Sequence, residues 1–181
     1  MPLKRFAARR RAAAALALAG AAIAVVTIVP TAATAATRAC SSASLVVWLD
    51  TQGSGAAGSS FYDLQFTNLS ARACRLSGYP GVSAVNLRGR QVGHAASRDP
   101  QQPARTVTLA AGASAHTVLR IVDAGNFPRS RCGPVTAAGL RVYPPGQTAS
   151  KLIPYPFAAC ARDSATVLTV EALQKGLGVN Q

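Results

Sequence analysis

The chain has 181 residues, with 19 Lys and Arg against six Asp and Glu, a formal net charge of +13 and a hydrophobic share of 49%. The hydrophobic share excludes a disordered polyelectrolyte, and the length allows one ordinary domain. Six acidic residues and two His leave little material for acid–base or metal chemistry. Lys occurs only at positions 4, 151 and 175, and this dominance of Arg over Lys is what GC-rich codons favour.

The N-terminal segment has the layout of an export signal. Met1 to Arg11 carries five basic residues, and 12–29 follows without a charge and is rich in Ala. After Pro30, the run Ala33-Thr34-Ala35 fits the small-residue pattern at which signal peptidases cleave. The sequence therefore predicts a signal peptide over 1–35, cleavage near Ala35, and a secreted or envelope-associated domain over 36–181.

The alternative interpretation is an uncleaved membrane anchor, because 12–29 is close to the roughly 20 residues that span a bilayer. In both cases the positive end stays inside and the rest of the chain is exported. Lipid attachment at Cys40 is not favoured, since Thr37-Arg38-Ala39 lacks the aliphatic residue of a lipobox. Without 1–35 the chain keeps 14 basic and six acidic residues, a formal charge of +8.

The first two predicted strands cover Ser44 to Asp50 and Phe61 to Leu69. In the second, aromatic and aliphatic residues at every other position predict one buried face and one solvated face. These residues are Tyr62, Leu64 and Phe66. The segment 52–60 between the strands is rich in Gly and Ser, and we expect a flexible connection.

Alternating or β-branched segments predict the remaining strands, at 82–87, 91–94, 105–109, 115–121, 140–143, 151–157 and 166–173. Pro154 and Pro156 restrict the segment that contains them to an edge strand or an extended loop. We expect loops at 97–103 and 123–134, and a frayed tail at 174–181.

About eight strands at intervals of roughly 8–12 residues, without an amphipathic helix, predict an all-β fold of one domain. The expected architecture is an immunoglobulin-like antiparallel β-sandwich. Trp48 lies too soon after Cys40 to reproduce the Cys–Trp–Cys spacing of antibody domains.

Four cysteines, Cys40, Cys74, Cys132 and Cys160, all lie in the part predicted to be exported. An even number in an oxidising compartment predicts two disulfides. Three pairings are possible, and we favour Cys40–Cys74 with Cys132–Cys160. Each of these closes a loop of about 30 residues, worth on the order of 3–4 kcal/mol. No His lies at metal-ligand spacing from a Cys, so we expect neither a metal nor a cofactor.

The four residues Gly78, Tyr79, Pro80 and Gly81 predict a tight turn with a positive φ at a glycine. We expect a structural turn in which the Tyr79 ring packs on the end of the sandwich and its hydroxyl forms a hydrogen bond. The alternative is an aromatic ring that stacks on a ligand.

The motifs around these cysteines resemble a known family. They are the segment from Phe66 to Val82, the turn at 108–115, Cys132 followed by Arg141 to Pro145, and Cys160 before the last strand. Together they resemble the secreted actinobacterial domain of unknown function 4232 over roughly residues 40–172. The resemblance implies a secreted or envelope-associated β-sandwich. Because the family has no established activity, it implies no catalytic residue.

No motif for catalysis stands out. His94 and His116 are the only candidate bases, but the chain has no G-x-S-x-G elbow, phosphate loop or dinucleotide fingerprint. Glu171 is the only Glu, so paired Glu residues for glycoside hydrolysis are missing. Asn68-Leu69-Ser70 matches a glycosylation sequon, which we interpret as a chance match. We therefore expect that the protein is not an enzyme.

Arginines are spread singly along the predicted domain, and two pairs, Arg88 with Arg90 and Arg129 with Arg131, are close in sequence. A basic surface outside the membrane favours anionic cell-envelope polymers or lipid headgroups as partners. The alternative is a solvated surface whose charge follows codon usage. Nucleic acid is not expected without a recognition motif. The sequence thus favours a non-enzymatic binding module, with a passive structural domain as the alternative.

Overall fold

The computed structural model describes residues 36–162 and 164–178, which belong to one compact unit, Ala35–Gln181. The predicted signal peptide over 1–35 lies outside the described residues. Within those residues, no helix has both the length and the apolar composition needed to cross a bilayer.

The described residues are organised mainly as strands. These are β1 (Leu45–Ala56), β2 (Ser59–Asn68), β3 (Cys74–Ser77), β4 (Gly81–Val85), β5 (Gln91–Val92), β6 (Ser97–Arg98), β7 (Thr106–Leu109), β8 (Ser114–Val122), β9 (Pro134–Tyr143), β10 (Lys151–Cys160), β11 (Leu168–Val170) and β12 (Gln174–Lys175). The helical elements are short, namely η1 (Ser42–Ser44), η2 (Ala124–Asn126) and α1 (Arg129–Cys132).

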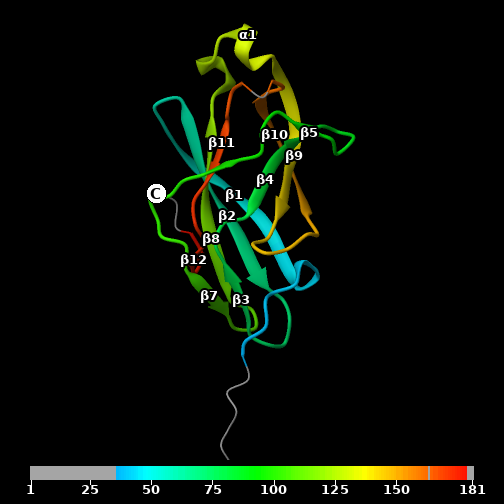
Figure 1. Cartoon of the computed structure of the whole chain (residues 1–181), viewed down its shortest axis with the longest axis vertical. Helices are drawn as coiled ribbons and strands as arrows, with labels where there is room; N and C mark the ends of the chain where they lie inside the picture. Colours follow the sequence, from blue (N-terminus) through cyan, green and yellow to red (C-terminus); the bar gives the residue numbers. More distant parts are fainter. Residues whose placement is uncertain (1–35, 163, 179–181) are drawn as a thin grey trace, which may run out of the picture. The chain divides into compact units, whose positions relative to one another are not determined.

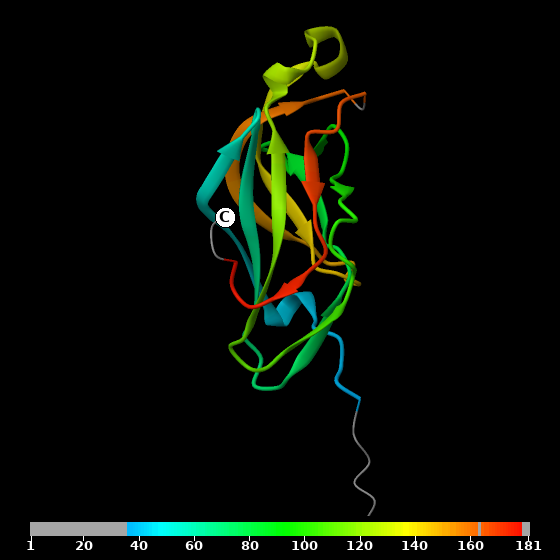
Figure 2. The same cartoon turned by 90° about the vertical axis from the view of Figure 1, so that its left-hand side faces the viewer.

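The strands form two large sheets and one small sheet (Figures 1 and 2). The first sheet has the order β1-β2-β8-β11-β6, and β12 also pairs with β8. The second sheet has the order β10-β9-β4-β5, and the small sheet joins β3 to β7. The prediction of an all-β sandwich with two disulfides is confirmed.

Two details of the fold prediction are wrong. The structure has twelve described strands rather than about eight, because β3 and the two-residue strands β6 and β12 carry too little pattern to be seen in the sequence. The arrangement is also not purely antiparallel. β6 pairs in parallel with β11, with Ser97 opposite Thr169, inside a segment that we expected to be a loop.

One hydrophobic core lies between the two large sheets. Leu64, Phe66 and Leu119 from the first sheet are 0% exposed, as are Leu140 and Val142 from the second. The alternation predicted for β2 and β8 therefore does direct their apolar side chains inward. A fully buried Leu or Phe contributes roughly 1.5–3 kcal/mol, so this layer is the main stabilising element.

The Gly/Ser-rich segment at 52–60 is not a flexible connection. It completes β1 and starts β2, and the two strands meet at the two-residue turn Ala57-Gly58, with φ of 47° and 70°. Two positive φ values give the type I′ turn that matches the twist of a hairpin. The backbone ladder pairs Ser54 with Phe61 and continues to the tip. Backbone pairing needs no apolar pattern, and for that reason the sequence did not predict it.

The predicted frayed tail is also partly wrong. β12 pairs with β8, with Gln174 opposite His116, and the Gly178 N–H reaches the side chain of Gln65 at 3.4 Å. The C-terminal segment thus covers part of the outer face of the first sheet. As a result, Asp63 and Gln65 are buried, although alternation predicted that they would be solvated.

Candidate functional site

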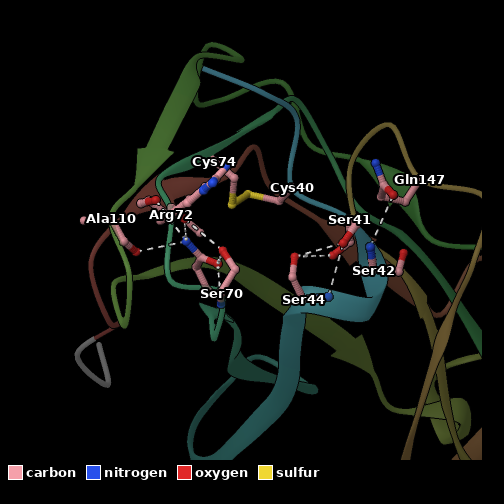
Figure 3. Close-up of a disulfide and its surroundings, with 11 residues drawn as sticks. Cys40, Ser41, Ser42, Ser44, Ser70, Arg72, Cys74, Ala110 and Gln147 are labelled. Carbon is pink, nitrogen blue, oxygen red and sulfur yellow. Dashed lines mark hydrogen bonds between the residues drawn. A yellow bond between two sulfur atoms is a disulfide. The ribbon is translucent and has the colours of Figure 1, made fainter. Parts of the chain in front are cut away.

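The four cysteines pair as expected, Cys40 with Cys74 and Cys132 with Cys160. Figure 3 shows the first disulfide beside η1, where the Ser41 hydroxyl caps the turn by accepting from the Ser44 N–H at 3.3 Å. The Cys40 N–H donates to the Arg75 carbonyl at 2.9 Å. This disulfide therefore fastens the segment before β1 to β3.

The second disulfide fastens the opposite end of the fold. The short helix α1 ends at Gly133 with a φ of 55°, and the Ala161 N–H donates to the Gly133 carbonyl at 3.0 Å. The disulfide and this bond hold the loop before β9 against the end of β10. The predicted loop at 123–134 thus contains η2 and α1, and its last residue, Pro134, begins β9.

The predicted turn at 78–81 connects the small sheet to the second sheet. Gly78 has a φ of 93°, and its carbonyl accepts from the Leu173 N–H at 3.0 Å. The Tyr79 hydroxyl donates to the Gln102 carbonyl at 3.4 Å, and the Arg98 guanidinium lies 5.4 Å from the centre of the Tyr79 ring. These contacts support the structural interpretation, since the ring already has a cationic partner.

The predicted sequon has a structural use instead. Asn68 is 0% exposed, and its Nδ2 lies 2.8 Å from the Arg72 carbonyl and 3.1 Å from the Ala110 carbonyl. Its amide nitrogen is committed to backbone acceptors, so in the folded domain this asparagine is not available for modification.

A cleft lies between the tip of the β1–β2 hairpin and the edge strand β10. It has a volume of about 430 Å³. Aromatic side chains form one wall, and hairpin backbone with Ser59 and Ser60 forms another. The aromatic side chains are Tyr62, Tyr155 and Phe157. We call this the aromatic cleft; its volume lies within the range of roughly 300–1,000 Å³ typical of small-ligand sites.

Two bulges on facing edge strands build the aromatic cleft. In β1 the register shifts between Asp50 and Ser54, which places three residues opposite Tyr62. In β10 it shifts between Pro154 and Phe157, a segment that contains Tyr155. A bulge bends its strand and redirects side chains. Here the bulges leave aromatic rings of the two sheets in contact at the open side of the sandwich.

Glycine makes room for the first ring. A Cβ on Gly53 would lie 2.5 Å from Cδ1 of Tyr62, so no larger residue fits there without displacing the ring. At the hairpin tip, the Gly58 carbonyl accepts from the Asp123 N–H at 2.9 Å and from Asn126 Nδ2 at 2.8 Å. The loop after β8 thereby holds the hairpin tip at the mouth of the aromatic cleft.

The rings of the aromatic cleft also contact one another. Tyr62 and Tyr155 meet edge to face with centroids 5.2 Å apart, and Tyr155 stacks on Phe157 at 6.1 Å. The Tyr155 hydroxyl donates to the Tyr62 hydroxyl at 2.5 Å. Burial, and secondly this hydrogen bond, raise the pKa of Tyr155 to about 12. The Tyr155 phenol is therefore neutral at physiological pH, and the aromatic cleft offers apolar faces with hydroxyl groups at their edge.

Charge is distributed unevenly between the two large sheets. Four of the six acidic residues gather around the first sheet, namely Asp50, Asp63, Asp99 and Glu171. Burial raises the pKa of Asp63 and also that of Glu171, and the neighbouring carboxylates add to both shifts, while His116 opposes them. By contrast, 81–92 and 134–160, which form the second sheet, contain no Asp or Glu.

Four arginines of the described residues donate from their side chains to neutral acceptors, namely Arg120, Arg131, Arg141 and Arg162. Arg141 Nη2 donates to the Gly89 carbonyl, and Arg162 Nη1 donates to the Ser130 carbonyl at 2.8 Å. Arg120 Nε donates to the Ser59 hydroxyl at 3.0 Å. A guanidinium bonded to a neutral oxygen keeps its full charge, so these side chains keep their attraction for an anion.

The structure separates the two candidate histidines. His116 is half-buried beneath the C-terminal segment, where its Nδ1 lies 3.0 Å from the Gly176 carbonyl. His94 is exposed, on the loop after β5. Among the described residues, neither histidine is hydrogen-bonded to a carboxylate or to a serine hydroxyl.

The aromatic cleft was not predicted from the sequence. Of the two alternatives predicted for the segment with Tyr155 and Phe157, an edge strand or an extended loop, the edge strand is correct. The convergence of these rings with Tyr62, however, depends on two bulges in different sheets. The available signal is the alternation of Pro with aromatic residues at 154–157. Because proline cannot donate to the backbone ladder, such an alternation indicates an edge strand whose pairing is interrupted.

One comparison with known proteins gives a match. The profile of a family described as a domain of unknown function (DUF4232) matches residues 40–174. No curated protein and no solved structure matches the chain.

Proposed function

Because the chain belongs to the DUF4232 family of domains of unknown function, whose description assigns no activity, we propose its function from the aromatic cleft: the protein is a non-enzymatic binding module that works outside the cytoplasm. The single observation that carries this proposal is the meeting of Tyr62, Tyr155 and Phe157 in a cleft of about 430 Å³. A concave site with apolar walls and a few convergent polar groups is the usual form of a ligand site.

The chemistry of the aromatic cleft favours a neutral ring that carries hydroxyl groups, such as a saccharide unit of an envelope polymer. The C–H face of such a ring packs on aromatic side chains, and its hydroxyls bond to phenols, serines and backbone groups. Ser60 shares a strand face with Tyr62 and supplies a hydroxyl beside it, whereas the Ser59 hydroxyl already accepts from Arg120 Nε. A ligand held only by such contacts is bound without any bond being broken, which agrees with a non-enzymatic role.

The location outside the cytoplasm is supported by the two disulfides. Disulfides of this kind persist in oxidising compartments. We propose that residues 1–35 act as a signal peptide and are removed near Ala35; an uncleaved anchor would leave the same module at the membrane. The intact mass of the native protein, measured with and without reductant, distinguishes the two cases. Loss of residues 1–35 and a gain of two thiol pairs on reduction are expected.

The basic surface supports a second, complementary contact with anionic envelope material. Guanidinium groups bonded to neutral oxygens attract phosphate or carboxylate groups over about one Debye length, roughly 8 Å at physiological salt. The saccharide and the anionic groups of one polymer would then occupy the aromatic cleft and the arginines together. This contact is expected to weaken as salt is added, whereas ring packing in the cleft is not.

The proposal is tested by retention of the native protein on isolated cell walls at low and high salt. Phe157→Ala, which removes one ring of the aromatic cleft, is expected to reduce retention about tenfold at both salt concentrations. Leu69→Ala is the matched control, since Leu69 is 65% exposed and lies away from the cleft. Equal retention of the two variants would reject the cleft as the site. Absence of retention at every salt concentration would favour a passive structural domain.

A further inference from the structure

The outer face of the second sheet carries a second hollow, apolar and separate from the aromatic cleft. Its volume is about 230 Å³, and Leu87, Leu152 and Pro154 are among the residues that line it. Gly139 lies in its floor, where a Cβ would come within 2.3 Å of the Ile153 carbonyl oxygen. The hollow therefore depends on a position that only glycine fits.

Two leucines beside this hollow are exposed to an unusual degree. Leu87 is 96% exposed at the tip of the β4–β5 hairpin, and Leu152 is 61% exposed on the edge strand β10. Single exposed apolar residues are common, but two that line one hollow form a continuous apolar patch. Its exposure leaves apolar surface in water that a partner would cover.

The hairpin holds Leu87 in this position. The Asn86 side-chain oxygen accepts from the Arg88 N–H and from the Arg90 N–H, both at 3.0 Å. The Asn86 N–H donates to the Arg90 carbonyl at 2.9 Å, and Arg141 Nη2 donates to the Gly89 carbonyl. With its backbone bonded from several sides, the tip presents Leu87 as a fixed projection, so docking would order little new chain.

Positive charge surrounds the patch without a compensating carboxylate. Arg88 and Arg90 flank the hairpin tip, and both are exposed. Arg141 lies on the same face, since it stands directly opposite Leu152 in the β9–β10 ladder. We call Leu87, Arg88, Arg90, Arg141 and Leu152 the leucine–arginine face.

We propose that the leucine–arginine face docks on the surface of an anionic lipid bilayer. The inference rests on the envelope association proposed above and names its surface and its partner. A bilayer interface offers anionic headgroups to arginines and an acyl boundary to apolar side chains in the same plane. A purely polar anionic polymer would satisfy the arginines but leave both leucines in water. The bilayer therefore matches both halves of the face.

The test is co-sedimentation of the native, disulfide-intact protein with two kinds of vesicle. One kind contains phosphatidylglycerol mixed with phosphatidylcholine, and the other contains phosphatidylcholine alone. Binding is expected only to the first kind and is expected to weaken with salt. The double variant Leu87→Ala/Leu152→Ala should lose about tenfold in partitioning. Arg88→Gln/Arg90→Gln should lose about 25-fold, at about fivefold for each charge.

Two controls separate the face from general charge and general hydrophobicity. Leu69→Ala removes a comparably exposed leucine elsewhere, and Arg72→Gln removes an exposed arginine near the first disulfide. Neither is expected to change vesicle partitioning more than about twofold. Because the wild type and all variants share the same N-terminus, a contribution from that segment cancels in the comparison.

Polyphosphate immobilised on beads supplies the polar anion without a lipid phase. Vesicle binding that is unaffected by the double leucine variant overturns the proposal. So does retention on polyphosphate with no binding to anionic vesicles, a result that would leave the envelope association intact. Binding to neither material would reject the lipid surface and the arginine contact together, while the aromatic cleft would still be judged by wall retention.

Discussion

The two large sheets share one hydrophobic core, but their outer faces differ in charge and in exposed apolar residues. The first sheet carries four carboxylates, Asp63 among them, and is covered in part by the chain's own C-terminal segment. The second sheet has no acidic residue and bears exposed Leu87 and Leu152 among arginines. The inner faces are both apolar, because alternate positions of each strand point into the core and carry apolar side chains. The outer faces differ, and our proposal for a docking surface on the second sheet rests on this difference.

The aromatic cleft lies where the two sheets meet at their open side. Tyr62 comes from the first sheet and Tyr155 from the second, so a ligand there contacts both. In a strongly basic protein, the carboxylates on one sheet also leave the other sheet with an unopposed positive charge. This arrangement gives an anionic partner one preferred side of approach.

The largest expected effect concerns the disulfide that fastens the second sheet. Cys132→Ala/Cys160→Ala should lower the free energy of unfolding by about 3–4 kcal/mol, because it releases a loop of 28 residues. Removal of Cys40–Cys74, with a separation of 34, should cost a similar amount. Urea unfolding measures both.

The two disulfide variants should differ in binding. Release of Cys160 frees the end of β10, the strand that holds Tyr155 and Phe157, so wall retention should fall in that variant only. A matching loss of retention after removal of Cys40–Cys74, at a temperature where both variants are folded, would contradict the assignment of the aromatic cleft to β10.

A smaller effect is expected at the edge of the first sheet. Gly53→Ala would place a Cβ 2.4 Å from the Phe61 carbonyl oxygen and close to the Tyr62 ring, which should cost about 1–3 kcal/mol. Gly55→Ala is the matched control, with its nearest neighbour at 3.9 Å, and should stay within about 0.5 kcal/mol. Thermal unfolding and near-ultraviolet circular dichroism report the two effects. Equal stability of both variants would mean that the β1 bulge does not position Tyr62.

Asp63 and Glu171, near the first sheet, should make the free energy of unfolding depend on pH in the acidic range. The folded pKa values of Asp63 and Glu171 are raised, so their contribution to stability is fully present below the unfolded pKa values and is lost as pH rises through the folded ones. Asp63→Asn should therefore reduce the loss of stability between acidic and neutral pH, and Glu171→Gln should do so less. Urea midpoints across this range give the slopes. An unchanged slope in Asp63→Asn would show that this carboxylate is not buried.

The smallest effect belongs to the aromatic cleft and lies at alkaline pH. Tyr155 should ionise near its pKa of about 12. Because the folded pKa is raised, the contribution of Tyr155 to the free energy of unfolding is present below its unfolded pKa and is lost as pH rises through its folded pKa. Tyr62→Phe removes the hydrogen-bond acceptor and should lower the pKa of Tyr155, though not to its ordinary value, since burial is the larger cause. Ultraviolet titration of tyrosinate measures the change. Ionisation of all tyrosines together would contradict the contact.

The sequence predicted those parts of the fold that depend on local pattern. The inward faces of β2 and β8, the edge position of β10, the glycine turn at Gly78 and both disulfide pairings agree with the structure. Each of these predictions rests on alternation, on the backbone preferences of proline or glycine, or on the length of the loop that a disulfide closes. All three can be read directly from the sequence.

The remaining features depend on contacts between distant segments. β6 and β12 have two residues each and exist only because β11 and β8 offer them free edges. Burial of Asp63 depends on a C-terminal segment more than a hundred residues away, which bonds to its neighbour Gln65. The convergence of Tyr62 with Tyr155 likewise requires bulges in two sheets. No local pattern encodes such contacts, so the aromatic cleft was not predicted.

The most direct test of the binding role is amide chemical-shift mapping of the native, disulfide-intact protein titrated with soluble fragments of cell wall. We expect saturable shifts at the β1–β2 hairpin tip and at 155–158 of β10, the two sides of the aromatic cleft. Phe157→Ala should abolish them, while Leu69→Ala should not. Shifts confined to the arginines, or no shifts at saturating fragment, would contradict a ligand site in the aromatic cleft.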